Sequence, residues 1–412
     1  MSTDYGIDPQ LVEEYIMTMA QYGAHGETGV WRPVYSEAWF AAQDQIAAWG
    51  EEAGLVVTRD AVGNVWGRLE GSQGGKTIVS GSHIDSQLPG GRYDGVLGVL
   101  SALIAMRRLK EQFGTPQRTL EFVSFCEEES SRFAQARHWG SRAVAGAIAP
   151  EDLATVVSYD GEQIGDVMRS VGLDPDKVAE AQRDDIDIFV ELHIEQGPIL
   201  EEFGLPVAVV SGITGIRHYH IDLLGRADHA GARPMDLRRD PMAGAAEIIS
   251  TAVDTAHRMG RPAVTTCGMV KVEPNAASIV PEKVHFTIDA RHPDPEQREI
   301  LYQKHEAMFR EVAVRRNLDI SWTLGAEQPP RPSDTELVQL FQSAAEEQNV
   351  PYLTMQSGAV HDANRMADLS RMVMLFVQSK DGRSHTPAEF TSVEHAVEGI
   401  KVLTAGLHKL AY

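Results

Sequence analysis

The sequence is poor in cysteine and has no excess of basic residues. Its 412 residues include only two cysteines, too few for a disulfide framework, so we expect a reducing, cytoplasmic compartment. Acidic residues outnumber basic residues by 59 to 37, which gives a formal net charge of −22. A field of this sign repels phosphate backbones, and we therefore exclude nucleic acid as a partner.

Long apolar runs are also missing. The longest useful one, Val96 to Met106, is about half as long as a membrane-spanning helix needs to be. Residues 1 to 10 are polar and acidic and lack the basic and then apolar pattern of a signal peptide. We expect a soluble protein with no membrane partner.

The length exceeds what one hydrophobic core usually serves, so we expect two domains. Short apolar runs bounded by glycine and polar residues alternate with helical patterns, which is typical of a mainly parallel sheet covered by helices on both faces. The predicted strands of this α/β domain are Leu55 to Arg59, Asn64 to Leu69, Thr77 to Ser82, Thr119 to Phe125, Asp187 to Leu192 and Met372 to Gln378.

The middle of the chain has a different pattern. Alternating strands and two helices, Asp240 to Arg258 and Gln297 to Arg316, follow one another as strand, helix, strand, strand, helix, strand. This order is typical of a split βαβ, ferredoxin-like α+β domain. We predict it as an insertion at residues 213 to 330, so that residues 1 to 212 and 331 to 412 together form the first domain.

Histidine or acidic residues directly follow four of the predicted core strands. The chain places His83 and Asp85 after the first, Glu127 to Glu129 after the second, His193 after the third and His385 after the fourth. Ligands of parallel sheets bind beyond the carboxyl ends of the strands, so we expect these side chains to converge.

A further candidate, Asp94, lies in the glycine-rich loop before the helix that follows the first of these strands. Each residue alone has a structural explanation: a single histidine is usually structural, and an acidic run can open a helix. Together, three histidines with carboxylates favour a site for Zn²⁺, Mn²⁺ or Co²⁺.

Several longer motifs carry a family resemblance. They are Gly81-Ser-His-Ile-Asp-Ser, Gly91-Arg-Tyr-Asp-Gly, Phe125-Cys-Glu-Glu-Glu, Glu191-Leu-His-Ile-Glu-Gln-Gly-Pro, Asp228-His-Ala-Gly, Asp289-Ala-Arg-His, Ser357-Gly-Ala-Val-His-Asp-Ala and Ser384-His-Thr-Pro. This series resembles the M20 metallopeptidases and, more narrowly, their hydantoinase/carbamoylase branch. That branch contains N-carbamoyl-L-amino-acid hydrolases, allantoate amidohydrolases and β-ureidopropionases.

The resemblance implies two divalent metal ions per subunit. It assigns His83 and His193 to one ion, Glu128 and His385 to the other, and Asp94 as the bridge between them. It also implies that Glu127 is the general base. From its position two residues after His83, we expect Asp85 to orient that imidazole.

In the inserted domain the resemblance implies a lid that also forms a homodimer. His229 resembles a histidine that stabilises the oxyanion in the neighbouring subunit's site, and Arg291 resembles the arginine that binds the substrate carboxylate. For Arg291 the alternative is a surface charge that ends a strand. Gln196 and Arg217 are further candidates for binding a small carboxylate substrate.

The residues expected around the substrate depart from the family pattern in four places. Ser278 stands where the family usually has Asn, Arg233 where it has Thr, Val360 where it has Gly, and Asn364 where Gln is common. We therefore predict an amidohydrolase that cleaves the C–N bond of a small N-carbamoyl amino acid. The alternatives are an allantoate amidohydrolase, an N-acyl amino acid deacylase or dipeptidase, and a non-catalytic binding protein of the same fold.

Overall fold

A computed structural model describes residues 3–412, so Met1 and Ser2 of the N-terminal stretch discussed above lie outside the described residues. The chain divides into two compact units. One contains the chain up to Ser211 and again Ser333–Tyr412, and the other contains Gly212–Pro332. The role of the second unit as a lid and dimerisation domain stays a prediction.

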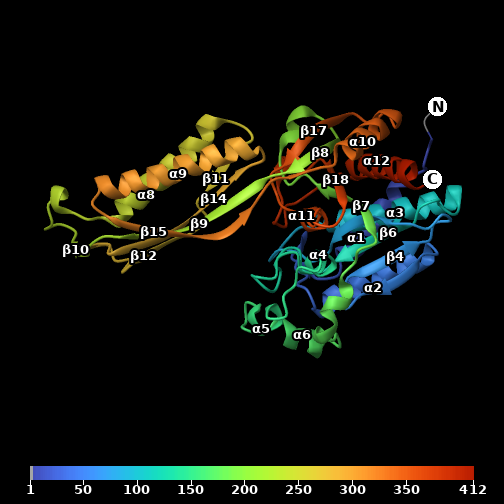
Figure 1. The fold of residues 1–412 in the computed structure, drawn as a ribbon, viewed down its shortest axis with the longest axis horizontal. Helices are drawn as coiled ribbons and strands as arrows, with labels where there is room; N and C mark the ends of the chain where they lie inside the picture. The colour runs from blue at the N-terminus through green and yellow to red at the C-terminus, as the bar shows by residue number, and fades with distance from the viewer. Residues whose placement is uncertain (1–2) are drawn as a thin grey trace. The chain divides into compact units, whose positions relative to one another are not determined.

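The first unit is built on a nine-stranded sheet with the order β16-β8-β18-β7-β5-β6-β4-β3, in which β17 also pairs with β8 and the short edge strand β16 consists of the last two residues of the range Gly212–Pro332 (Figure 1). Its strands are β3 (Val56–Arg59), β4 (Val65–Leu69), β5 (Thr77–His83), β6 (Leu120–Phe125), β7 (Ile186–Ile194), β8 (Val207–Ile213), β16 (Arg331–Pro332), β17 (Tyr352–Ser357) and β18 (Arg371–Val377).

This sheet is mixed, which corrects the prediction of a mainly parallel one. Strands β18, β7, β5 and β6 are parallel to one another and form the centre. The hairpin of β3 and β4 continues the sheet antiparallel beyond β6, and β8 and β16 do so beyond β18. Burial alone does not reveal strand direction, because central strands are apolar on both faces whichever way their neighbours run.

The long helices of this unit bury the sheet. They are α1 (Pro9–Met19), α2 (Glu37–Glu52), α3 (Val96–Phe113), α10 (Thr335–Glu347) and α12 (Val393–Ala411). Helix α3 packs on β5 and β6, and α12 packs on α3 and β18. Ser36 and Ser392 begin α2 and α12 by accepting a backbone N–H with their hydroxyl oxygens, which satisfies a donor that the first turn leaves free.

Short elements complete the unit. They are β1 (Ala24–His25), β2 (Gly29–Val30), α4 (Trp139–Val144), α5 (Asp152–Thr155), α6 (Ile164–Ser170), η1 (Pro175–Ala181), α7 (Ile199–Phe203), α11 (Ala363–Met366) and η3 (Lys380–Gly382). Helices α4 and α11 pack against each other, and α11 also packs on β7 and β18. These contacts place the loops before α4 and α11 near the carboxyl ends of the central strands.

The second unit has an antiparallel sheet with the order β11-β14-β9-β15, and β12 also pairs with β14. This is the strand order of a split βαβ arrangement. Its elements are β9 (Gly215–Leu224), β10 (Asp228–His229), η2 (Met235–Leu237), α8 (Pro241–Met259), β11 (Val264–Thr266), β12 (Val270–Glu273), β13 (Ile279–Val280), β14 (Lys283–His292), α9 (Pro295–Arg315) and β15 (Asp319–Gln328).

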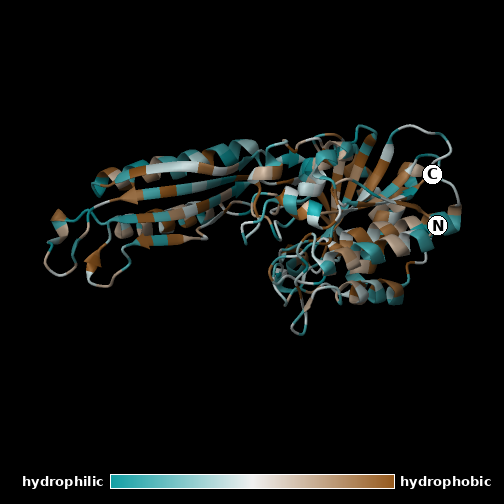
Figure 2. Cartoon of the chain, turned by 90° about the horizontal axis from the view of Figure 1, so that it is seen from below, coloured by the Kyte–Doolittle hydropathy of each residue, from teal (hydrophilic) through white to brown (hydrophobic). Residues whose placement is uncertain are grey.

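The two sheets also differ in the hydropathy of their strands (Figure 2). Strand β5 is buried at every position, whereas β14 alternates between half-buried and buried residues. In the second unit one face of the sheet therefore packs on α8 and α9, and the other carries polar side chains. Among the described residues, no helix has both the length and the apolar composition needed to cross a membrane.

Candidate metal centre

The candidate metal ligands lie beyond the four central parallel strands, as the sequence predicts. His83 is the last residue of β5, and His193 is the last but one of β7. Glu128 and Glu129 follow β6, and His385 follows β18 after the short helix η3. Because these strands are neighbours and run the same way, their carboxyl ends open on one edge of the sheet.

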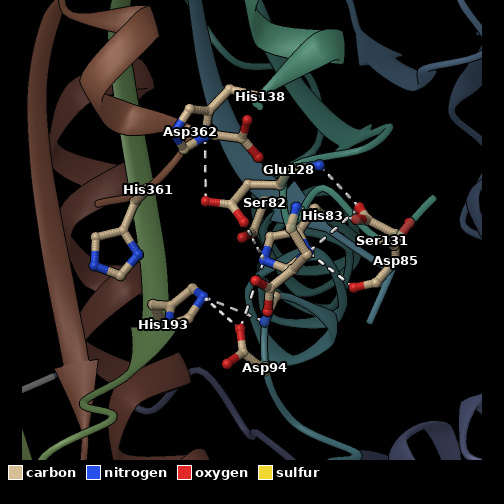
Figure 3. A network of polar contacts seen from close by, with 12 residues as sticks. Ser82, His83, Asp85, Asp94, Glu128, Ser131, His138, His193, His361 and Asp362 are labelled. Carbon is tan, nitrogen blue, oxygen red and sulfur yellow. Dashed lines mark hydrogen bonds and ion pairs between the residues drawn. The ribbon is translucent and has the colours of Figure 1, made fainter. Parts of the chain in front are cut away.

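The first ligand group contains His83, Asp94 and His193, all of them buried (Figure 3). The Nε2 atoms of His83 and His193 lie 3.6 and 3.2 Å from Oδ1 of Asp94. The two imidazole rings have their centroids 6.0 Å apart. One carboxylate thus faces two imidazole nitrogens, which is a donor set typical of zinc and similar ions.

The hydrogen bonds of these two histidines test whether a cation fits between them. Nδ1 of His83 lies 3.1 Å from the carbonyl oxygen of Asp85, and Nδ1 of His193 lies 2.9 Å from that of Ile194. A carbonyl oxygen only accepts, so each Nδ1 carries a proton and Nε2 of each ring faces the Asp94 carboxylate. Against the effect of burial, the nearby carboxylates raise the pKa of both imidazoles, so this cluster favours a positive charge between its members and the residues fit a metal ion.

The second group contains Asp94, Glu129 and His385. Nε2 of His385 lies 3.5 Å from Oδ2 of Asp94 and 3.2 Å from Oε1 of Glu129. Oδ2 of Asp94 also accepts hydrogen bonds from Nε2 of Gln196 at 2.7 Å and from Oγ of Ser384 at 2.5 Å. Asp94 thus belongs to both groups, one at each of its oxygens.

This geometry differs from the ligand set that the family resemblance implies, which stays a prediction. The carboxylate beside Asp94 and His385 is that of Glu129, which we did not predict, and not that of Glu128. Three glutamates follow one another here, and they lie in a loop, where the alternation of a strand no longer fixes which way a side chain points. The acidic run was therefore visible in the sequence, but not which of its members faces Asp94.

Glu128 lies beside the first group and forms a further candidate group with His83 and Glu129. Its Oε2 is 3.8 Å from Nε2 of His83 and its Oε1 is 3.2 Å from Nδ1 of His138 (Figure 3). Burial, together with the negative charge of Glu129, raises the pKa of the Glu128 carboxyl, although the nearby His83 acts against this. A buried carboxylate next to the ligands, but outside the two groups that share Asp94, is placed to take up and release a proton.

The carboxylate of Glu127, the predicted general base, is bound within its own loop. It accepts hydrogen bonds from the hydroxyl of Ser131, from the backbone N–H of Arg132 at 2.9 Å and from that of Phe133 at 2.7 Å. Burial and then the charge of Asp85 raise the pKa of Glu127 to about 8. Glu127 is in none of the candidate ligand groups among the described residues, and its hydrogen bonds indicate that it shapes the loop after β6.

Asp85 acts on the site in two ways. Its carbonyl oxygen faces Nδ1 of His83 at 3.1 Å, whereas its carboxylate is 3.6 Å away from that nitrogen. The two carboxylate oxygens accept the backbone N–H groups of Glu128 and Glu129, both at 3.1 Å. Asp85 therefore orients the imidazole through its backbone, and with its side chain it holds the loop that carries the two glutamates.

Several residues of the site have left-handed backbone angles. φ is 53° at Glu127, 57° at His138, 58° at Gln196 and 55° at His385. This conformation is unfavourable for residues other than glycine and persists only where the surroundings enforce it. Such residues gather at functional sites, and here each of them lies in a loop that carries or adjoins a candidate ligand.

Gly95 provides a test of how closely the site is packed. It has a φ of 67°, and a Cβ on it would lie 2.4 Å from Nε2 of His83. We expect Gly95→Ala to weaken metal binding by about 10- to 100-fold, because the methyl group pushes a ligand out of place. Titration of the metal-free protein with Zn²⁺ or Mn²⁺ measures this effect.

Gly74→Ala is the matched control for this variant. Gly74 has the same φ of 67°, but a Cβ on it meets nothing within 4 Å. Both variants carry a similar cost for the left-handed conformation, on the order of 1 to 2 kcal/mol. Equal metal affinity in the two variants would show that contact with His83 does not matter.

The remaining candidate residues of the first unit differ in how directly they contact the two ligand groups. Gln196 contacts Asp94 directly, and its Nε2 is also 3.4 Å from Nε2 of His385. Asn364 is buried and accepts the backbone N–H of His361 at 2.8 Å, so it shapes its own loop. Val360 is half-buried. His361, which we did not predict as a site residue, forms a further group with Glu191 and His193.

In the second unit Arg291 is held by Asp289. Its Nε and Nη2 donate to the two oxygens of Asp289 at 2.9 and 2.8 Å, and Nε2 of His218 lies 2.6 Å from the same carboxylate. Burial by itself raises the pKa of Asp289. The hydrogen bonds and positive charges of His218 and Arg291 outweigh this effect and lower the pKa to about 2. The planar guanidinium is thereby fixed on the polar face of the sheet.

The contacts of Arg217 give no support for a role in substrate binding. Its guanidinium donates to Glu327 and, at 3.4 Å, to Glu306. It also lies over the ring of Tyr302, 4.2 Å from the centroid. Two carboxylates and an aromatic ring already use the charge and the face of this side chain.

The other three candidates of this unit share one loop region. Nδ1 of His229 accepts the backbone N–H groups of Gly231 and Ala232, both at 3.1 Å, so Nε2 carries the proton and faces outward as a donor. Arg233 donates twice to the carbonyl oxygen of Leu237, at 3.0 and 2.9 Å. Ser278 is exposed and accepts the N–H of Ala230 with its backbone oxygen.

Comparisons with known proteins identify relatives of this chain. A model of peptidase family M20/M25/M40 matches residues 80–409. Allantoate amidohydrolase of Escherichia coli K12 is 38% identical over 404 residues, which cover 98% of each chain. N-carbamoyl-L-amino acid amidohydrolase of Geobacillus stearothermophilus is 37% identical over 399 residues, which cover 96% of this chain and 97% of that protein.

A similar structure has also been solved. The crystal structure of an amidase of the hydantoinase/carbamoylase family from Burkholderia multivorans has a TM-score of 0.90 at 32% sequence identity, and the match covers 98% of each chain. The family resemblance that the motifs predict is therefore confirmed.

Proposed function

The chain belongs to peptidase family M20/M25/M40, and from this premise we propose that it is an amidohydrolase cleaving the C–N bond of a small ureido acid. An N-carbamoyl amino acid is the favoured substrate. The observation that supports this most directly is the position of Asp94 between two ligand groups, with the separate carboxylate of Glu128 beside them. Relatives named amidohydrolases, over nearly their whole length, support the same class of reaction.

We propose that His83 and His193 hold one divalent metal ion, that Glu129 and His385 hold another, and that Asp94 serves both. Zinc, manganese and cobalt suit these histidine and carboxylate donors. Bound there, the ions supply the Lewis acidity that attack on a poorly electrophilic ureido or amide carbon requires.

In this proposal the residues of the chain itself handle the proton and orient the ligands. Glu128 takes the proton from the attacking water and passes it to the leaving nitrogen, since its carboxylate lies beside His83 and belongs to neither of the two groups that share Asp94. Asp85 keeps His83 in one tautomer with its carbonyl oxygen and fixes the loop of Glu128 with its carboxylate. Gln196 contacts Asp94 and His385 and limits their movement.

We further propose that the second unit is a lid and dimerisation domain. Arg291 would bind the substrate carboxylate with its guanidinium fork, and His229 would donate from Nε2 to the oxyanion in the neighbouring subunit's site. The outward N–H of His229 and the fixed plane of Arg291 support these roles. Both cysteines, Cys126 and Cys267, are free thiols, which supports a reducing, cytoplasmic compartment.

A substrate panel tests the proposed reaction. We expect release of ammonia from N-carbamoyl-L-amino acids, together with the free amino acid, and faster turnover than with N-acyl amino acids of the same side chain. Ammonia and free amine are measured in parallel in the metal-loaded protein. Release of amine without ammonia, from acylated substrates only, would identify a deacylase and contradict the proposal.

The second candidate is an allantoate amidohydrolase, which the 38% identity to the Escherichia coli enzyme favours. Allantoate also carries ureido groups and a carboxylate, so the same metal centre and the same arginine serve it. Ammonia released from allantoate, but not from N-carbamoyl amino acids, would decide for this candidate. The residues Ser278, Arg233, Val360 and Asn364, which depart from the family pattern, are then the first positions to exchange.

A further inference from the structure

We propose that Glu389 is a positioning residue: it holds Asp94 in the orientation that serves both ligand groups and thereby determines how firmly metal is retained. This inference rests on the proposed metal centre. It concerns a residue that is in none of the candidate ligand groups among the described residues and that the sequence motifs did not single out.

The carboxylate of Glu389 is bound to the backbone of Asp94. Its Oε1 accepts the N–H of Tyr93 at 2.8 Å and the N–H of Asp94 at 3.0 Å. These residues lie at the end of the glycine-rich loop, two and three positions before helix α3 begins at Val96. A loop rich in glycine has little stiffness of its own, so an outside group that takes two consecutive amides fixes its path.

The other oxygen of Glu389 reaches the side chain of Asp94 through Ser384. Oγ of Ser384 lies 2.8 Å from Oε2 of Glu389 and 2.5 Å from Oδ2 of Asp94. Glu389 therefore binds the backbone of Asp94 directly, and it contacts the Asp94 carboxylate only through the hydroxyl of Ser384, whose single proton lies between the two acceptors. Ser384 directly precedes His385, so the contact also joins the loop of Asp94 to the loop that carries a ligand of the second group.

The surroundings are shaped to admit this carboxylate. Glu389 is 4% exposed. A Cβ on Gly91 would lie 2.1 Å from its Oε1, so only glycine leaves the room that the carboxylate occupies. It forms hydrogen bonds with two amides and a hydroxyl, and none of these groups carries a positive charge.

Burying a carboxylate with neutral partners is costly and contributes little to folding that an apolar residue would not contribute better. A role in orienting Asp94 explains why the Glu389 carboxylate is buried at this position. Partners that orient metal ligands in this way commonly change metal affinity or activity by about 10- to 100-fold when they are removed.

Exchange of Glu389 for Ala and for Gln separates positioning from charge. In Glu389→Gln the side-chain oxygen still accepts the two amides, and the new NH₂ group donates to Ser384, whose own proton stays directed at Asp94. We expect Glu389→Ala to lose Zn²⁺ to a chromogenic chelator about 10- to 100-fold faster than the unchanged protein, and Glu389→Gln to remain within about threefold of it.

Asp60→Ala is the matched control. Asp60 is a half-buried carboxylate that also accepts two backbone N–H groups, those of Val62 and Asn64, at 3.1 and 3.0 Å. It belongs to none of the ligand groups among the described residues. We expect Asp60→Ala to lower the melting temperature, as Glu389→Ala also does, but to leave the rate of metal loss unchanged.

Three results would overturn the inference. One is metal retention in Glu389→Ala equal to that of the unchanged protein. Another is equally fast loss in Glu389→Gln and Glu389→Ala, which would assign the effect to charge. The third is the same acceleration in Asp60→Ala, which would assign it to general loosening of the fold.

If Glu389→Ala does not fold, Ser384→Ala replaces it in the test, because this variant removes only the hydroxyl between Glu389 and Asp94. An unchanged rate of metal loss in Ser384→Ala would then contradict the inference. Failure of the proposed function gives a different result. The unchanged protein would then release no ammonia from any ureido acid, while the order of metal loss among the variants would still follow the prediction.

Discussion

Glu128→Gln is expected to lower kcat by roughly 10²- to 10⁴-fold while the metal content stays that of the unchanged protein. The glutamine has nearly the same shape but cannot take the proton from water. Glu128 lies 3.8 Å from the imidazole of His83 and in neither of the groups that share Asp94. Its removal should therefore affect proton transfer more than metal binding, and KM should change little.

Glu127→Gln is the matched control for this experiment, because it changes the neighbouring glutamate in the same way. Its carboxylate is occupied by Ser131, Arg132 and Phe133, so the expected result is a loss of stability on the order of 1 to 2 kcal/mol and a kcat within about tenfold of normal. Turnover is measured at saturating substrate, and bound metal by elemental analysis. A large loss in Glu127→Gln with normal turnover in Glu128→Gln would restore the assignment made from the sequence.

Asp94→Ala is expected to remove both metal ions and to lower turnover by at least about a thousandfold. Asp94 is the only residue shared by the groups His83–Asp94–His193 and Asp94–Glu129–His385 among the described residues. Without it, each group keeps two ligands, fewer than the three or four that hold zinc in proteins. Elemental analysis after gel filtration gives the number of ions per chain.

Glu129→Ala provides the comparison for Asp94→Ala. It belongs to the group with His385 and to the one with His83 and Glu128, but not to the group with His193. We expect it to lose one ion and to keep the one held by His83, Asp94 and His193. Two ions retained in Asp94→Ala, or none retained in Glu129→Ala, would contradict the shared role of Asp94.

Much of the fold was readable from the sequence because it follows from periodicity. The strands β3 and β4, a helix after β5 and the two long helices of the second unit were predicted from apolar spacing and lie where the structure has them, within a few residues. Strand direction was not readable. The antiparallel flanks of the first sheet are set by which strands become neighbours, and that is a property of the folded chain.

The site shows the same division more sharply. Histidines and acids at four strand ends, with Asp94 in the following loop, were sufficient to predict a metal centre and its place at the carboxyl edge of the sheet. Which glutamate of the run Glu127 to Glu129 faces Asp94 could not be read from the sequence, and in the structure it is Glu129. A loop has no fixed period, and the left-handed turn at Glu127 directs its side chain into its own loop.

The sequence by itself determined the kinds of ligand, their order along the chain and the family, because these depend on residue type and spacing. Only the tertiary structure decided that Glu129 stands beside His385, that Arg217 is held by Glu306 and Glu327, and that Glu389 supports Asp94 from 295 positions further along the chain. Contacts between such distant segments arise from strand order and loop path, and neither of these is written in any local stretch of residues.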